Sequence, residues 1–102
     1  MPIARRSAAA EHDLQTIAYH VAFIDRKPLA ADQIIDDLIG AAERLAELST
    51  VSIMGTAAPE FGNGIRLFHC QRWVIIFRYA SHGIDVLRFV DGKQDYMAWK
   101  LD

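Results

Sequence analysis

The chain has 102 residues, of which 52% are apolar and 24% are charged, and its formal net charge is -2. This length and composition are typical of one compact domain, which excludes a two-domain enzyme and predicts a single domain over residues 1–102. The small negative charge argues against a surface devoted to nucleic acid, because neutralising phosphates requires clustered Lys and Arg. We therefore expect no direct DNA binding by this chain alone.

Cysteine content and hydropathy indicate the compartment. Cys70 is the single cysteine, so no disulfide can form within the chain, which suits a reducing environment. No apolar run reaches the roughly 18 to 20 residues that span a bilayer, and residues 1–10 lack the apolar stretch of a signal peptide. We expect a soluble, cytoplasmic protein without membrane contact.

Two helices are predicted in the first half of the chain. Ser7 suits an N-cap, and apolar residues then recur at helical spacing, which predicts a helix over Ala8–Ile24. After a short break, Pro28 suits the first turn of a second helix, whose wide apolar stripe extends from Ile34 to Leu48. The short turn between the two predicts an antiparallel helical hairpin.

The second half is predicted to form a sheet. After a glycine-rich loop over residues 49–64, three runs are rich in β-branched and aromatic side chains, namely Ile65–His69, Arg72–Tyr79 and Ile84–Val90. The turns between them predict an antiparallel meander, to which Pro2–Arg5 would add an edge strand and Tyr96–Leu101 a last helical turn or tail. The predicted fold class is α+β, with an N-terminal helical hairpin packed on a three- to four-stranded antiparallel sheet.

Apolar side chains alternate onto both faces of this sheet. In the strand at 72–79, Trp73, Ile75 and Phe77 alternate with Val74 and Ile76. One helical hairpin covers one face of a small sheet. The other face therefore either exposes aliphatic side chains and arginines to a protein partner, or is closed by the loop and the C-terminal tail. The residues that would close it are Met54, Phe61 or Trp99.

The charge is divided unevenly along the chain. Residues 1–60 contain 5 basic and 9 acidic side chains, whereas residues 61–102 contain 6 basic and 4 acidic ones. Arg66, Arg78 and Arg88 lie in or beside apolar strands, where a guanidinium loses hydration unless it is paired or faces an anionic partner. Either each of them pairs with a neighbouring carboxylate, or together they form a cationic face.

Motifs for metal or cofactor chemistry are not apparent. The turn Gly62–Gly64 lacks the preceding strand and the Lys-Ser/Thr pair of a phosphate loop. The four histidines lack metal-ligand spacing, and Cys70 has no nucleophile signature around it. We expect no metal, no cofactor and no catalytic residue.

Several short motifs follow one another along nearly the whole chain. They are Ala10-x-x-Asp13-Leu14-x-x-Ile17, Leu45-x-x-Leu48, Pro59-Glu60-Phe61, Gly64-Ile65-Arg66, Trp73–Arg78 and Ile84–Asp95. Their order and spacing resemble the ParE branch of the ParE/RelE toxin superfamily. The chain differs from the pattern at five positions, where the family commonly has Tyr, Pro, Tyr, His and Arg. These positions are His20, Ser49, Phe77, Asp91 and Gln94.

The resemblance implies a toxin of a bacterial toxin-antitoxin operon. The partner would be an antitoxin of the ParD type, and the target of characterised ParE-like toxins is DNA gyrase, which they inhibit by binding. RelE-like relatives are instead ribosome-dependent mRNA endonucleases. In that alternative, Arg66 and Arg88 would supply cations and Tyr96 or His69 an acid or base. An inactive or immunity-like interaction module is a third hypothesis, favoured by Asp91 and Gln94.

Two sets of contact residues follow from these hypotheses. For the antitoxin, we expect contacts at the apolar and arginine side chains of the sheet, namely Trp73, Ile75, Phe77, Val86 and Arg88. For the target, we expect contacts at the basic residues of the final strands and the aromatic residues after them. These residues are Arg78, Arg88, Lys93, Tyr96 and Trp99.

Overall fold

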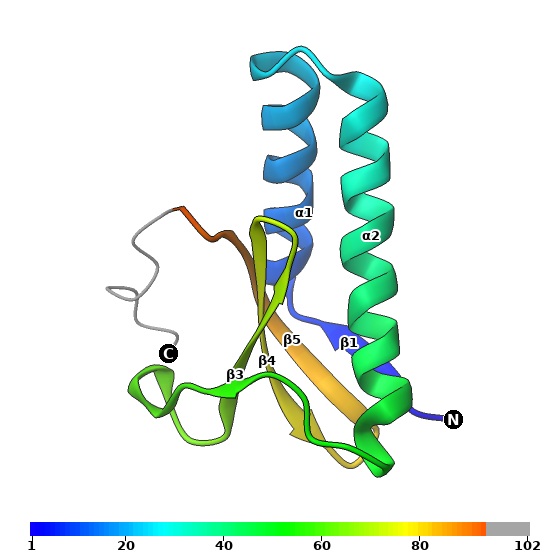
Figure 1. The fold of residues 1–102 in the computed structure, drawn as a ribbon, viewed down its shortest axis with the longest axis vertical. Helices are drawn as coiled ribbons and strands as arrows, with labels where there is room; N and C mark the ends of the chain where they lie inside the picture. Colours follow the sequence, from blue (N-terminus) through cyan, green and yellow to red (C-terminus); the bar gives the residue numbers. More distant parts are fainter. Residues whose placement is uncertain (94–102) are drawn as a thin grey trace.

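A computed structural model describes residues 1–93 of the chain (Figure 1). The helical turn or tail expected at Tyr96–Leu101 lies outside the described residues. The helical elements are α1 (Ala8–Tyr19), a π-helical turn (His20–Ile24), α2 (Pro28–Glu47) and two 3-10 turns (Leu48–Thr50 and Pro59–Phe61). The strands are β1 (Ile3–Arg6), β2 (Thr56–Ala57), β3 (Ile65–Cys70), β4 (Trp73–Ala80) and β5 (Gly83–Asp91).

The helical hairpin forms as its sequence predicts. Oγ of Ser7 accepts a hydrogen bond from the Ala10 N–H at 3.0 Å, which satisfies a free amide in the first turn of α1. The predicted helix Ala8–Ile24 is confirmed, with its last turn widened into a π-helix. Pro28 begins α2 at a position where its missing N–H has no cost. Figure 1 shows the two helices side by side, with their connected ends extending beyond the sheet.

The sheet is mixed and has the strand order β1-β5-β4-β3-β2. The predicted meander is confirmed as β3, β4 and β5. The expectation of a three- to four-stranded antiparallel sheet was wrong in two details. The N-terminal strand pairs parallel to β5, and β2 is a fifth strand that pairs with β3. A strand as short as β2 shows no periodicity in the sequence, and no tight turn links β1 to β5 to reveal its direction.

A bulge in β5 changes which side chains share a face. Ile76 pairs with Arg88, but the next residue, Phe77, pairs with Val86, so Leu87 is an extra residue in β5. Strict alternation would place Val86 and Val90 on one face and Phe89 on the other. In the structure, Phe89 instead joins Val86 beneath the helices, and Val90 packs on the opposite face.

Both faces of the sheet are covered by apolar packing. The larger cluster lies between the sheet and the helical hairpin and includes Leu14, Leu38, Leu45, Ile75 and Phe77. The smaller cluster lies on the opposite face and comprises Ala58, Phe61, Ile65, Leu67, Val74, Ile76 and Val90. Of the two alternatives for that face, the buried side chains support closure by the loop through Phe61. Met54 packs against the helix-facing cluster instead, and Trp99 lies outside the described residues.

Among the described residues, no helix has both the length and the apolar composition needed to cross a membrane.

Candidate functional site

The second half of β5 has an edge that no strand covers among the described residues. β1 pairs with β5 only from Gly83 to Val86, because the chain leaves the sheet at Ser7 to begin α1. The other side of β5 stays paired with β4 as far as Asp91. On the side away from β4, the backbone of Leu87–Asp91 therefore has no strand partner among the described residues and faces α1.

Two side chains of the α1 region bind this edge. Oγ of Ser7 donates to the Leu87 carbonyl at 2.8 Å. Oδ2 of Asp13 accepts the Phe89 N–H at 3.0 Å. A carboxylate can lie on the buried side of a helix only where hydrogen bonds replace its hydration, and Asp13 is 8% exposed.

Arg88 supplies the remaining partners of Asp13. Its Nε and Nη2 donate to Oδ2 and Oδ1 of Asp13 at 2.7 and 2.8 Å, a bidentate pair. This hydrogen bonding raises the pKa of Arg88 above its ordinary value, against a smaller opposing effect of burial. Arg88 therefore stays charged and is directed toward α1.

The backbone beyond Asp13 remains directed outward. In an antiparallel pair, the N–H and C=O of one residue point to the same side, and the side alternates along the strand. The Gly92 N–H bonds to the Arg72 carbonyl toward β4, whereas the Phe89 N–H faces Asp13. The Phe89 carbonyl and both backbone groups of Asp91 consequently face the uncovered side. Such an edge is a template for another strand.

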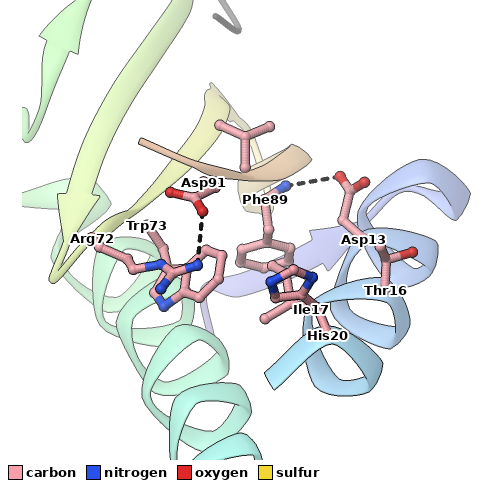
Figure 2. Close-up of a pocket in the computed structure, with 9 residues that line it drawn as sticks. Asp13, Thr16, Ile17, His20, Arg72, Trp73, Phe89 and Asp91 are labelled. Carbon is pink, nitrogen blue, oxygen red and sulfur yellow. Dashed lines mark hydrogen bonds and ion pairs between the residues drawn. The ribbon is translucent and has the colours of Figure 1, made fainter. Parts of the chain in front are cut away.

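A pocket of about 130 Å³ adjoins this edge (Figure 2). Residues of α1 form one wall, and the ends of β4 and β5 form the other. We call it the edge pocket; its lining residues are Asp13, Thr16, Ile17, His20, Arg72, Trp73, Phe89, Val90 and Asp91. A cavity of about 150 Å³ accommodates benzene, so the edge pocket has the size of one apolar side chain. Sites for cofactors and drug-sized molecules are commonly larger, at about 300 to 1,000 Å³.

The rim of the edge pocket is charged and internally paired. Nη2 of Arg72 lies 2.8 Å from Oδ2 of Asp91, and its guanidinium carbon lies 4.4 Å from the centre of the Trp73 ring. The other oxygen of Asp91 accepts the Lys93 N–H at 2.9 Å. Asp91, one of the departures from the family pattern, thereby fixes both Arg72 and the turn after β5.

The residues expected to contact an antitoxin do not form a surface. Trp73, Ile75, Phe77 and Val86 are at most 3% exposed and lie in the core beneath the helices. The helical hairpin covers the face on which these four side chains lie, so they are not accessible to an antitoxin in the folded chain. Trp73 alone of the four lines the edge pocket.

The residues expected to contact the target are separated in the structure. Arg78 is exposed and lies opposite Asp85, near the far end of β4 and β5. Lys93 is exposed just after the other end of β5, and Arg88 is paired with Asp13. Tyr96 and Trp99 lie outside the described residues. The target-binding set therefore stays a prediction.

The two arginines of the nuclease alternative are also apart. Nε and Nη2 of Arg66 donate to the carbonyls of Met54 and Gly55, each at 2.8 Å, and so hold the loop before β2. Arg88 lies across β4 from β3 and binds α1. His69 is on β3 and exposed. Among residues 1–93, no group of three His, Cys, Asp or Glu side chains is placed to bind a metal ion.

Sequence reasoning missed most of the edge pocket. Patterns in the sequence do not assign Thr16, His20 or Phe89 to a site, because the pocket depends on the bulge in β5 and on the early end of β1. Asp13 belongs to one of the family-like motifs, but its distance of 75 residues from Arg88 gives no local signal of pairing.

Comparisons with known proteins agree with this architecture. A family model described as "ParE toxin of type II toxin-antitoxin system, parDE" matches residues 4–96. A solved chain of the "Chromosomal ParDE TA system from P. aeruginosa" has a similar fold, with a TM-score of 0.64 and 22% sequence identity. The match covers 89% of the present chain and 96% of that one. No curated protein sequence gives a significant match.

Proposed function

The chain belongs to the ParE toxin family of type II toxin-antitoxin systems, and on this premise we propose that it arrests growth by binding DNA gyrase and is held inactive by a ParD-like antitoxin. In this proposal the toxin acts as a binding protein. The observation that carries this point is that both candidate catalytic arginines are already bound by partners within the chain.

The state of the two arginines favours binding over RNA cleavage. Cleaving RNA requires a base for the 2′-hydroxyl, a proton donor and cations at the phosphate. Arg66 uses its guanidinium on backbone carbonyls, and Arg88 uses its own on Asp13. Their distribution on different strands, with different internal partners, supports structural roles for both.

We place the antitoxin at the uncovered edge of β5. An extended segment can add to a sheet edge through main-chain hydrogen bonds, while its side chains enter neighbouring pockets. The outward backbone of Phe89 and Asp91 would supply the main-chain partners. The edge pocket, between α1 and the ring of Trp73, would accept one apolar side chain of the antitoxin. This site replaces the sheet face that the helices cover.

Supercoiling by purified gyrase tests the proposed activity. The chain is co-expressed with the antitoxin encoded beside it, separated from it and titrated into the reaction. We expect supercoiling to fall with added toxin and to recover on addition of the antitoxin. In parallel, primer extension on mRNA after induction should show no new ribosome-dependent cuts.

Two outcomes would contradict this proposal. Full supercoiling in a large excess of folded toxin would exclude gyrase as the target. Ribosome-dependent cuts that disappear in Arg66→Ala would support the endonuclease alternative instead.

A further inference from the structure

The connected ends of α1 and α2 expose a group of large apolar side chains. Tyr19, Phe23, Ile24 and Leu29 are 60–85% exposed, and they occupy the part of the hairpin that projects beyond the sheet in Figure 1. We call residues 19–29 the hairpin tip. Soluble proteins seldom expose neighbouring large apolar side chains unless these take part in an interaction.

Two of these side chains are in ring contact at the π-helical turn. The Asp25 N–H bonds to the His20 carbonyl at 2.9 Å, which closes the wide turn. The ring centres of Tyr19 and Phe23 lie 5.1 Å apart. Val21, in the same turn, is buried, so the inner side of the tip is already packed. Such turns are often found at functional sites.

The exposed apolar group is accompanied by positive charge. Arg26 and Lys27 are exposed, and neither forms a side-chain hydrogen bond or an ion pair with another described residue. Asp25 is the one acidic residue of the tip, and its Oδ1 lies 3.6 Å from Nε2 of His20. The tip is thus locally cationic, although residues 1–60 as a whole have more acidic than basic side chains.

The backbone of the tip adds to its positive electrostatic potential. α2 begins without a side-chain cap, so its first N–H groups and the positive end of its dipole face outward. Arg26 has a φ of 57°, a left-handed conformation that glycine adopts more easily. The turn therefore holds an arginine in a position where backbone energy alone favours glycine.

We propose that the hairpin tip docks on an acidic surface of the toxin's target protein, with Phe23 and Leu29 as apolar contacts and Arg26 and Lys27 as charged ones. This inference rests on the proposed function, in which the toxin acts by binding. Aromatic and arginine side chains are the residue types that contribute most at protein interfaces. Basic side chains beside them would select an acidic partner and speed its association.

Two other occupants fit the tip less well. A second copy of the chain in a symmetric dimer would bring Arg26, Lys27 and the α2 N-terminus against their own equivalents, which repel. A lipid surface is recognised by clusters of about four to eight basic residues, whereas the tip contains two. An acidic protein surface requires only a few cations around an apolar centre.

The tip is also distinct from the edge pocket. Of the tip, only His20 lines the edge pocket, and none of the proposed target contacts at Phe23, Arg26, Lys27 and Leu29 does. Loss of target binding and loss of antitoxin binding should therefore be separable by substitution.

Two double variants of the full chain test the proposal. Phe23→Ser with Leu29→Ser removes apolar contacts, and Arg26→Glu with Lys27→Glu reverses the charge. The matched control for the apolar variant is Val51→Ser with Ile53→Ser, at side chains that are 75% and 73% exposed elsewhere. Arg5→Glu is a single charge reversal outside the tip. The readouts are growth arrest on induction without antitoxin, half-inhibition of gyrase supercoiling, antitoxin affinity and circular dichroism.

We expect both tip variants to lose growth arrest and to require at least about tenfold more protein for half-inhibition of gyrase. They should keep the wild-type circular dichroism spectrum and bind the antitoxin with an affinity within about twofold of wild type. The corresponding change in binding free energy is smaller than the loss of one interfacial contact. The controls should arrest growth as wild type does.

Each contrary outcome decides a different question. Tip variants that arrest growth as wild type does overturn the proposal, and so does joint loss of arrest and antitoxin binding. Tip-dependent co-sedimentation of the wild-type chain with phosphatidylglycerol vesicles overturns it in favour of a membrane.

If the wild type arrests growth without inhibiting gyrase, and the tip variants lose arrest, the gyrase assignment fails and the tip remains the docking surface. A wild-type chain that arrests nothing contradicts both.

Discussion

Asp13 and Arg88 connect the helical hairpin to the sheet at the point where β1 no longer covers β5. The pair is bidentate, at 2.7 and 2.8 Å, and the same carboxylate accepts the Phe89 N–H. One side chain of α1 therefore satisfies both a guanidinium and an edge amide. This pairing gives the Arg88 guanidinium a carboxylate partner within the chain, although Arg88 lies in an apolar strand.

Replacing Asp13 by Ala should destabilise the fold. The change leaves Arg88 without its carboxylate and the Phe89 N–H without an acceptor, and hydrogen bonds to charged groups contribute about 1.5 to 3 kcal/mol each. We expect a loss of about 2 to 3 kcal/mol in the free energy of unfolding, measured by urea denaturation followed by circular dichroism.

Glu11→Ala is the control for that measurement. Glu11 also pairs with an arginine, Arg6, at 2.8 Å, but on the exposed side of α1. Exposed pairs contribute less than about 1 kcal/mol. Equal losses for Asp13→Ala and Glu11→Ala would show that the edge contact has no special role.

Two glycines should respond to alanine with opposite signs. Gly83 has a φ of 135°, and a Cβ there would collide with the Ile3 backbone of β1, so Gly83→Ala should cost about 2 to 4 kcal/mol. Gly40 lies within α2, and a Cβ there would meet no neighbouring atom within 4 Å, so Gly40→Ala should stabilise by about 0.5 to 1 kcal/mol. Thermal melting of both variants measures the two effects. A stabilising Gly83→Ala would contradict the pairing of β1 with β5.

The thiol of Cys70 should react slowly in the folded chain. Burial, and to a lesser extent the charge of Asp37, raises its pKa above the ordinary value. The folded state thus favours the neutral thiol, and stability is kept at low pH and falls as the pH rises above the ordinary pKa, where the unfolded chain ionises more readily. Because the thiolate is the reactive form, alkylation by iodoacetamide at neutral pH should be slower than in urea.

A pair of aspartates distinguishes the two causes of that shift. Asp37→Asn removes the nearby charge while keeping an oxygen for Gln71, whose amide donates to Asp37 at 2.8 Å. We expect a faster reaction, by less than about tenfold, since burial remains and one pKa unit corresponds to tenfold. Asp36→Asn, next to it and exposed, should leave the rate unchanged. Equal alkylation rates in the wild type, Asp37→Asn and Asp36→Asn would leave burial as the sole cause of the raised pKa of Cys70.

The sequence predicted the helices and the meander strands better than it predicted the strand pairing at the edge of the sheet. The long helices repeat an apolar stripe over many residues, and the meander strands are joined by short turns, so both were predicted within a few residues. The direction of β1 and the bulge at Leu87 leave no periodic signal. Because that one residue reverses the alternation in β5, it moved Phe89 into the core and hid the edge pocket.

The burial of the predicted antitoxin contacts has a related cause. Alternation along β4 correctly grouped Trp73, Ile75 and Phe77 on one face, but a sequence pattern does not say which face the helices cover. The loop residue Phe61 closes the other face, and as a result neither face of β4 is left as a broad apolar surface. The uncovered edge of β5 could be found only from the pairing of β1.

Filling the edge pocket should release the toxin from its antitoxin. Thr16 is exposed and lines the pocket, so Thr16→Trp should place an indole where we expect an antitoxin side chain to bind, without disturbing the core. Loss of one well-packed interfacial contact commonly weakens the binding free energy by about 2 kcal/mol, which is roughly thirtyfold in affinity. Gln15, the preceding residue of α1, is also exposed but does not line the pocket, so Gln15→Trp is the matched control. The measurement is growth on co-expression with the antitoxin, together with calorimetric titration of the purified pair. We expect cells with Thr16→Trp to stop growing despite the antitoxin, and those with Gln15→Trp to be rescued. Wild-type affinity in the titration reports that the variant is folded, so a fully rescued Thr16→Trp chain with wild-type affinity would exclude the edge pocket from the antitoxin site.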